Sequence, residues 1–196
     1  MTLPRTPSFS LNGKRALVVG ASSGIGSACA VALAEHGADV TLAARRKDRL
    51  LKLVDEMRLE ELNVSALEVD VAKVEKTGVI IAEEGPFDIL VNSAGLAKHS
   101  RSLETLTNDF DTVLEINLKG AYFLTQAVAK GLVEAGKPGS LINISSQMGL
   151  IGGQERAVYC ASKHAVEGFT KAMAIELGPN NIRVNTICPT FILTDM

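Results

Sequence analysis

The heptapeptide Gly20-Ala21-Ser22-Ser23-Gly24-Ile25-Gly26 joins an apolar run at residues 15–19 to a helix-period segment that extends over about residues 24–36. The apolar run predicts a strand, and Gly37 marks the expected end of the helix. Glycines at a strand-to-helix junction let the backbone turn tightly, and they let a pyrophosphate approach the free N–H groups of the helix. The heptapeptide therefore predicts a dinucleotide-binding turn, with an ordinary glycine-rich turn as the simpler alternative.

Short apolar runs alternate with longer helix-period segments along the rest of the chain. The sequence predicts strands at residues 15–19, 40–43, 64–69, 89–91, 141–144 and 183–187, and helices at residues 24–36, 47–62, between the third and fourth strands, 108–134 and 158–177. This alternation favours parallel strands with crossover helices on both faces, an α/β doubly wound parallel sheet. We predict one domain at residues 14–196, after a loose arm at residues 1–13 that is rich in Pro, Ser and Thr.

The composition excludes several classes of protein. With 196 residues, 46% hydrophobic residues, 21% charged residues and a net charge of -2, the chain is typical of a globular domain. Nothing in this charge balance favours nucleic acid or an anionic membrane surface as a partner. No apolar run approaches the roughly 20 residues that span a bilayer, and the first residues do not resemble a signal peptide.

The three cysteines also bear on the kind of protein. Cys29, Cys160 and Cys188 are an odd number and have no Cys-x-x-Cys spacing, so the sequence predicts neither a disulfide framework nor a metal site. We expect reduced thiols in a cytoplasmic protein.

A second group of polar residues follows the fifth predicted strand. Tyr159 and Lys163 are four residues apart on a predicted helix and share one face. A free tyrosine has a pKa of about 10, and we expect the lysine ammonium to lower that pKa toward neutrality. Ser146 follows the strand at residues 141–144, at the sheet edge where such folds bind ligands. We predict that its hydroxyl binds a substrate oxygen, with Ser145 as the alternative.

The predicted helix at residues 158–177 needs an apolar face toward the core. We expect that face to hold Ala161, Ala165, Phe169 and Met173, roughly opposite the pair of polar side chains.

The end of the second predicted strand bears on cofactor choice. About 20 residues beyond the glycine turn, where proteins that prefer NAD carry Asp or Glu, the chain reads Ala43-Ala44-Arg45-Arg46. Arg45 is predicted to pair with the 2′-phosphate of NADP, which makes NAD the second choice. The alternative is a solvated cluster of charges.

These motifs, together with Asn92-Ser93-Ala94-Gly95, resemble the short-chain dehydrogenase/reductase family from about Lys14 to the last residue. The resemblance implies a Rossmann-type fold, a nicotinamide cofactor and carbonyl–alcohol interconversion. The implied catalytic residues are Asn117, Ser146, Tyr159 and Lys163. The implied cofactor contacts are Gly20, Ser22, Ser23, Gly24, Ile25, Gly26, Arg45, Asp70, Val71, Asn92, Ala94, Gly95, Tyr159, Lys163, Pro189, Ile192 and Thr194.

Two of these implied roles have ordinary structural alternatives. Asn117 would hold a water that relays protons between Lys163 and solvent, but an Asn inside a helix can also be a packing or kink residue. Asp70 would contact the adenine, but its carboxylate can also cap the following turn.

We therefore predict an NAD(P)-dependent oxidoreductase that interconverts a carbonyl and a secondary alcohol on a small polar or sugar-like substrate. NADPH would supply the hydride, and Tyr159 the proton. The alternatives are an NAD-linked polyol or hydroxy-acid dehydrogenase, and a non-catalytic dinucleotide-binding sensor or scaffold. Family habit implies a homodimer or homotetramer. It also implies a substrate-covering segment, which we expect to lie beyond Met196; the alternative is a protein that lacks this wall of the substrate pocket.

Overall fold

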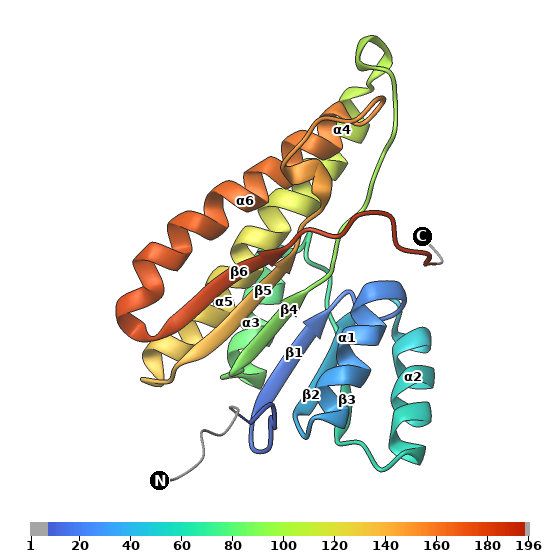
Figure 1. Cartoon of the computed structure of the whole chain (residues 1–196). Coiled ribbons are helices and arrows are strands. Elements are labelled where there is room, and N and C mark those ends of the chain that lie inside the picture. Colours follow the sequence, from blue (N-terminus) through green and yellow to red (C-terminus); the bar gives the residue numbers. More distant parts are fainter. Residues whose placement is uncertain (1–7, 195–196) are drawn as a thin grey trace, which may run out of the picture.

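A six-stranded parallel sheet forms the middle layer of the computed structural model, which describes residues 8–194 (Figure 1). Its strands lie in the order β3-β2-β1-β4-β5-β6. They are β1 (Arg15–Val19), β2 (Asp39–Ala44), β3 (Val64–Glu68), β4 (Ile89–Asn92), β5 (Gly139–Ile144) and β6 (Ile182–Ile187). The chain starts in the middle of the sheet and winds outward in both directions, which confirms the predicted doubly wound topology.

Helices cover both faces of this sheet, as predicted (Figure 1). The α-helices are α1 (Gly24–Glu35), α2 (Lys47–Leu59), α3 (Val74–Glu84), α4 (Thr107–Leu114), α5 (Ala121–Glu134) and α6 (Ala157–Leu177). Short 3-10 turns occur at η1 (Ser102–Glu104), η3 (Gln147–Gly149) and η4 (Gly178–Asn180), and a π-helical turn at η2 (Glu115–Gly120). Among the helices described in residues 8–194, none is long and apolar enough to cross a membrane.

The alternation of side chains along β1 builds two hydrophobic cores. Leu17 and Val19 point to the core under α3, α5 and α6, whereas Ala16 and Val18 point to the core under α1 and α2. All four side chains are essentially inaccessible to solvent. A strand buried on both faces needs an unbroken apolar run, and residues 16–19 provide it.

The predicted helix at residues 108–134 is present, but it is not α-helical throughout. The chain is helical from α4 through the π-helical turn η2 into α5 without a gap. Gly120 ends η2 against Val71, where an added Cβ would lie 2.9 Å from the Val71 carbonyl oxygen. π-Helical turns often mark functional sites in helices, and this one carries Asn117.

The predicted apolar face of α6 is wrong in part. Ala161 is exposed, Ala165 and Phe169 are half-buried, and only Met173 is buried as expected. The helix instead buries the polar side chains of Ser162, Lys163, Glu167 and Thr170. Three of these four side chains form hydrogen bonds with groups of β5, β6 and η2. Hydrogen bonds therefore replace apolar contacts on this face of α6.

The predicted N-terminal arm lies only partly in the described range. Residues 1–7 lie outside the described residues. Leu11 packs against the core, and its N–H donates to the His36 carbonyl at 2.7 Å.

Candidate active site

The carboxyl ends of β1, β4 and β5 meet at one edge of the sheet. The glycine turn follows β1, the Asn92–Gly95 segment follows β4, and Ser145 and Ser146 follow β5. Because β1 and β4 are direct neighbours, the turn that follows each of them packs against the other. The predicted cofactor and catalytic residues are thereby gathered at this edge.

The glycine turn is built for close approach. Gly20 adopts φ +83°, and an added Cβ would lie 2.7 Å from the Ala94 nitrogen. At Gly26 an added Cβ would collide with the Gly20 carbonyl oxygen. Ser23 precedes α1 with an extended backbone, and its side chain does not cap the helix. The cradle therefore fits an anionic diphosphate, because the first N–H groups of α1 keep their hydrogen-bonding capacity.

Arg46 lies closer to this turn than the predicted Arg45. Its Nη2 donates to Ser22 Oγ at 2.8 Å and to Ser23 Oγ at 3.1 Å. Arg45 is exposed, and within residues 8–194 its side chain makes no hydrogen bond or ion pair. Sequence reasoning considered the basic pair but selected the first arginine. The turn of the chain between β2 and α2, which decides between them, cannot be read from the residue types.

The predicted adenine and ribose contacts lie at the same edge. Asp70 follows β3, and its Oδ1 accepts from the Ala72 N–H at 3.1 Å, as the capping alternative expected. Val71 is buried against Gly120. Asn92 is fully engaged inside the protein, because Nδ2 donates to Asn143 Oδ1 at 3.0 Å and Oδ1 accepts from the Ala94 N–H at 3.2 Å.

Asn117 is bound at both ends of its side-chain amide. Oδ1 accepts from the Leu96 N–H at 2.9 Å, while Nδ2 donates to the Leu96 carbonyl at 2.8 Å and to Ser162 Oγ at 3.1 Å. An added Cβ at Gly95 would lie 3.2 Å from Asn117 Oδ1 and 3.7 Å from Lys163 Nζ. These contacts join the loop after β4 to η2 and α6.

Lys163 is buried beneath Tyr159. Its Nζ donates to the Ile144 carbonyl at 2.8 Å and lies 5.7 Å from the centre of the Tyr159 ring. Burial lowers the pKa of Lys163 to about 8, against opposing effects of Cys188 and Glu167. The Lys163 ammonium thus lies under the face of the Tyr159 ring and is bound to the main chain of β5.

The prediction that Lys163 lowers the pKa of Tyr159 is wrong for the protein alone. Burial raises the pKa of Tyr159, and this effect outweighs the lowering by a hydrogen bond with Ser146 and by the charge of Arg156. The physical reason is the position of the lysine ammonium, which donates to a main-chain carbonyl and lies under the ring. Ser146 is therefore close to the phenol, whereas Ser145 Oγ is buried without a hydrogen-bond partner among the described residues.

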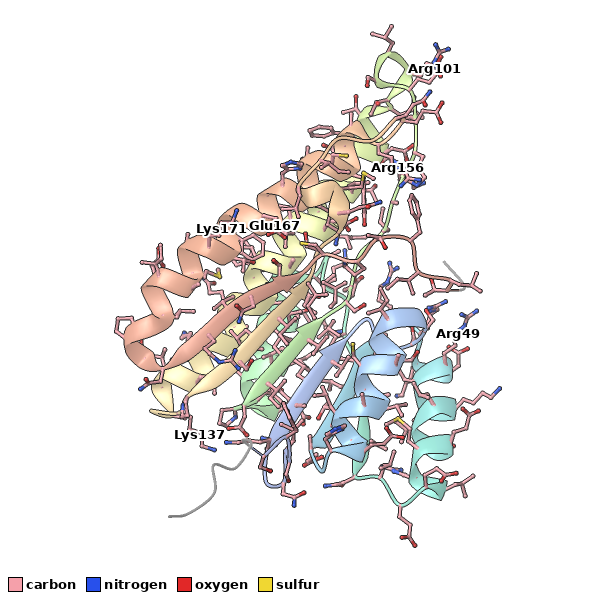
Figure 2. The ribbon with its side chains drawn as sticks, in the orientation of Figure 1. Arg49, Arg101, Lys137, Arg156, Glu167 and Lys171 are labelled. Atoms are coloured by element: carbon pink, nitrogen blue, oxygen red, sulfur yellow. The ribbon has the colours of Figure 1, made fainter. Side chains whose placement is uncertain are left out.

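Two residues beside Tyr159 did not enter the predicted site. The His99 ring packs edge-on against Tyr159, with ring centres 6.5 Å apart. The Arg156 guanidinium lies 5.6 Å from the centre of the Phe191 ring, where the segment after β6 approaches the start of α6 (Figure 2). His99 lies in the loop after β4, close to the tyrosine ring. Arg156 could have been noticed from its place one turn before Tyr159.

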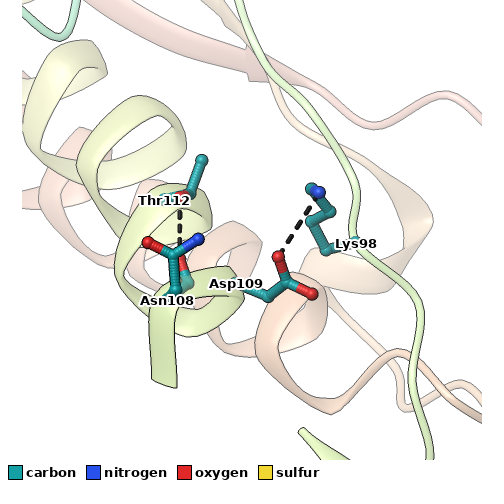
Figure 3. A network of polar contacts seen from close by, with 4 residues as sticks. All are labelled: Lys98, Asn108, Asp109 and Thr112. Atoms are coloured by element: carbon teal, nitrogen blue, oxygen red, sulfur yellow. Dashed lines mark hydrogen bonds and ion pairs between the residues drawn. The ribbon is translucent and has the colours of Figure 1, made fainter. Parts of the chain in front are cut away.

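The loop that carries His99 is attached to α4. Lys98 Nζ lies 3.3 Å from Asp109 Oδ1, and the neighbouring Thr112 hydroxyl donates to the Asn108 carbonyl at 2.7 Å (Figure 3). An ion pair of this exposure contributes less than about 1 kcal/mol, so it orients the loop more than it stabilises the fold.

The segment after β6 runs back across the sheet edge toward the glycine turn (Figure 1). The Pro189 carbonyl accepts from the Gln147 N–H at 2.9 Å, and the Thr194 side chain lies beside Gly24. Ile192 between them is exposed. All three predicted contacts in this segment therefore lie along the rim of the site.

Comparison with known proteins settles which family has this arrangement. The family model described as short chain dehydrogenase matches residues 14–196. The chain belongs to the short-chain dehydrogenase family. It is therefore a member of a family of NAD(P)-dependent alcohol dehydrogenases and carbonyl reductases.

Several of the related proteins are named as sugar or sugar-acid enzymes. The chain is 40% identical over 186 residues to the L-xylulose reductase of Mus musculus, covering 95% of this chain and 75% of the relative. A structure from Agrobacterium tumefaciens, described as a candidate 2-deoxy-d-gluconate 3-dehydrogenase with bound NADP, is 42% identical with a TM-score of 0.90, covering 95% and 75% of the two chains. A gluconate 5-dehydrogenase from Burkholderia cenocepacia J2315 with NADP and tartrate is 31% identical with a TM-score of 0.87, covering 93% and 73%.

Proposed function

We propose that this chain catalyses the NADP-dependent interconversion of a carbonyl and a secondary alcohol on a small sugar-like substrate. The observation that carries the proposal is the stacking of Lys163 beneath Tyr159, with Ser146 beside the phenol, at the sheet edge that holds the glycine turn. When bound, the nicotinamide supplies the hydride in reduction and accepts it in oxidation.

The protein's own residues handle the proton. In reduction, Tyr159 donates its phenolic proton to the carbonyl oxygen of the substrate, and in oxidation it takes a proton from the alcohol. The Ser146 hydroxyl donates a hydrogen bond to the same oxygen and stabilises the charge that develops there. The Lys163 ammonium lies beneath the ring, and together with the positive charge of a bound nicotinamide it would offset the burial that raises the pKa of Tyr159.

Asn117 is a positioning residue in this proposal and does not contact the substrate. Its amide is occupied by Leu96 and Ser162, so the side chain holds the loop after β4 in place. A relay water between Lys163 and solvent would be held by the main chain of η2, where the α-helical hydrogen-bond pattern is interrupted.

The cofactor would lie across the carboxyl edge of the sheet. The glycine turn and α1 would hold the diphosphate, the segments after β3 and β4 the adenosine, and the segment after β6 the nicotinamide end. The residues proposed to contact it are Gly20, Ser22, Ser23, Gly24, Ile25, Gly26, Arg45, Arg46, Asp70, Val71, Asn92, Ala94, Gly95, Tyr159, Lys163, Pro189, Ile192 and Thr194.

Two observations support NADP over NAD. Arg46 is already oriented toward Ser22 and Ser23, and β2 ends without a carboxylate that would bind a ribose 2′-hydroxyl. Three related structures contain NADP, and a fourth contains NADPH.

A sugar acid is the second candidate substrate, and Arg156 favours it. The guanidinium is close enough to Tyr159 to lower its pKa, so a carboxylate on the substrate would meet a positive charge near the reacting carbon. Arg156→Gln should then raise KM for a keto-acid sugar by about 10-fold or more, the loss of one charge-assisted hydrogen bond, and leave KM for a neutral ketose nearly unchanged. Equal effects on both substrates would exclude the sugar acid.

We also propose a homo-oligomeric, cytoplasmic enzyme. α4, α5 and α6 carry the exposed apolar side chains of Phe110, Phe123 and Ile175, which a partner subunit would cover. The three cysteines are unpaired, as is usual in a reducing compartment. Light scattering of the purified chain tests the homo-oligomer, because a monomer at micromolar concentration would contradict it.

The central experiment compares NADPH with NADH on wild type and Tyr159→Phe, using a panel of ketoses, keto-acid sugars and dicarbonyls. We expect NADPH-dependent turnover in wild type and a loss of turnover in Tyr159→Phe with NADPH binding retained. Binding of NADPH by wild type without turnover of any substrate would favour the sensor. A preference for NADH would overturn the cofactor assignment alone.

A further inference from the structure

Glu167 is a buried carboxylate that the mechanism above does not use. It lies on α6 one turn after Lys163, and its residue is only 7% exposed (Figure 2). No salt bridge within residues 8–194 includes it, although Lys171 lies one turn further along the same helix. Burying a carboxylate without a contacting cation is costly, so its presence requires an explanation.

The carboxylate accepts hydrogen bonds from the strand beside α6. Thr186 Oγ1 donates to Oε2 at 3.0 Å, and Cys188 Sγ donates to Oε1 at 3.3 Å. The side chain also packs against η3, because an added Cβ at Gly149 would lie 3.2 Å from Glu167 Cγ. Glu167 thus joins the helix of Tyr159 and Lys163 to the segment after β6 and to the turn after Ser146.

The charge of Glu167 reaches Lys163 from within the same helix. The groups around the ammonium are Tyr159 and Glu167 on α6, Cys188 after β6, the Ile144 carbonyl of β5 and the neutral amide of Asn117 on η2. Among these groups, Glu167 is the one carboxylic acid. Burial lowers the pKa of Lys163 to about 8, and both Cys188 and Glu167 oppose that effect.

We propose that Glu167 is a positioning residue that keeps Lys163 in its charged form and holds the segment after β6 against the active site. This role rests on the proposed function, because a charged Lys163 matters to turnover only if Tyr159 transfers the proton. A carboxylate is needed here, since a neutral acceptor could bind Thr186 but could not offset the burial of the ammonium.

Glu167→Gln removes the carboxylate and keeps nearly the same side-chain shape, so it tests the effect of the charge alone. Because the opposing charge is lost, the pKa of Lys163 should fall by about one unit, and the alkaline limb of the pH profile of kcat should move down by a similar amount. Glu167→Asp keeps the charge and should retain the wild-type limb. Lys171→Gln, on the exposed side of the same helix, is the control and should change neither the limb nor kcat.

A direct titration keeps this test independent of turnover. The Nζ-adjacent carbon of Lys163 can be followed by NMR in enzyme labelled with 13C-lysine, with Lys163→Arg assigning the signal. If wild type turns over no carbonyl substrate, the proposed function fails, yet a lower Lys163 pKa in Glu167→Gln would still support the electrostatic role. An unchanged Lys163 pKa in folded Glu167→Gln overturns the role.

A variant that moves the carboxylate guards against misfolding. Where Glu167→Gln alone is insoluble, the double variant Glu167→Gln/Cys188→Asp restores a carboxylate on the other side of the same contact. We expect it to fold and to titrate Lys163 near the wild-type pH. A folded double variant with a lowered Lys163 pKa would show that the site needs the glutamate shape rather than its charge.

Discussion

Arg46 donates to the hydroxyl of Ser22 at 2.8 Å, and this contact ties the end of β2 to the glycine turn that follows β1. A guanidinium held there presents its remaining N–H groups to the edge of the turn, where a phosphate on the adenosine ribose would lie. The contact also fixes the arginine before any ligand arrives, which lowers the entropy that binding has to overcome.

Arg46→Ala should therefore weaken NADPH binding by about 10- to 100-fold, because a charge-assisted phosphate contact contributes roughly 1.5–3 kcal/mol. Binding of NADH should change little. Fluorescence titration of both cofactors measures the ratio. Arg45→Ala tests the neighbouring arginine, and Lys52→Ala, on an exposed position of α2, is the matched surface control. A larger loss in Arg45→Ala than in Arg46→Ala would reverse the assignment.

Two glycine-to-alanine changes should have opposite effects. Gly26→Ala places a Cβ against the Gly20 carbonyl oxygen, so the turn must distort, and we expect a loss of about 1–3 kcal/mol together with loss of cofactor binding. Gly78→Ala adds a methyl group to the middle of α3 with nothing within 4 Å, and it should stabilise the protein by about 0.5–1 kcal/mol. Thermal unfolding compares the two, and a stable Gly26→Ala that still binds NADPH would contradict the role of the turn.

Lys163 should lower the free energy of unfolding, because burial disfavours its charged form. Its pKa is about 8 in the folded protein, below the ordinary 10.5, so between these values the unfolded chain binds more protons and stability rises with pH. The full penalty is present below pH 8. At neutral pH the free energy of unfolding of Lys163→Met should therefore exceed that of wild type by about 1–3 kcal/mol. This difference should disappear as the pH rises toward 10.5. Denaturant unfolding at several pH values measures the difference, and a variant less stable than wild type at pH 7 would contradict it.

Asn117→Ala removes three hydrogen bonds and leaves the Leu96 N–H and carbonyl without their partner. Unsatisfied buried groups cost about 1–3 kcal/mol each, so the melting temperature should fall clearly. Because the loop after β4 loses its attachment, KM for NADPH should rise as well. Asn108→Ala, on an exposed position of α4, is the control. A variant with unchanged stability would mean that the loop is held by other contacts.

Most of the fold could be predicted, because short and largely apolar strands alternate with longer helical segments along the chain. The π-helical turn at η2 could not be predicted, because the contact between Gly120 and Val71 joins segments far apart in the chain. The prediction of the buried face of α6 from apolar spacing was wrong in part. Glu167 and Lys163 are buried there because they form hydrogen bonds with the neighbouring strands.

The site residues follow the same division. Residue types and spacing were enough to propose Tyr159 and Lys163 as a pair, and the family resemblance selected Ser146 over Ser145. The relative positions of Lys163 and the Tyr159 ring, and the choice between Arg45 and Arg46, depend on backbone geometry that spacing does not encode.

The π-helical turn η2 determines how this helix would respond to the deletion of one residue. A π-helical turn accommodates one residue more than an α-helix of the same length, so removing one residue within Glu115–Gly120 would let α4 and α5 fuse into a regular helix. Because the π turn already accommodates the additional residue, the side chains on either side of the deletion would keep nearly the same relative direction, and Leu124 and Val128 would stay in the core. The turn itself would lose its widened backbone, so Asn117 would lose its position beside Leu96. The irregular turn thus positions Asn117 without disturbing the core-facing half of this helix.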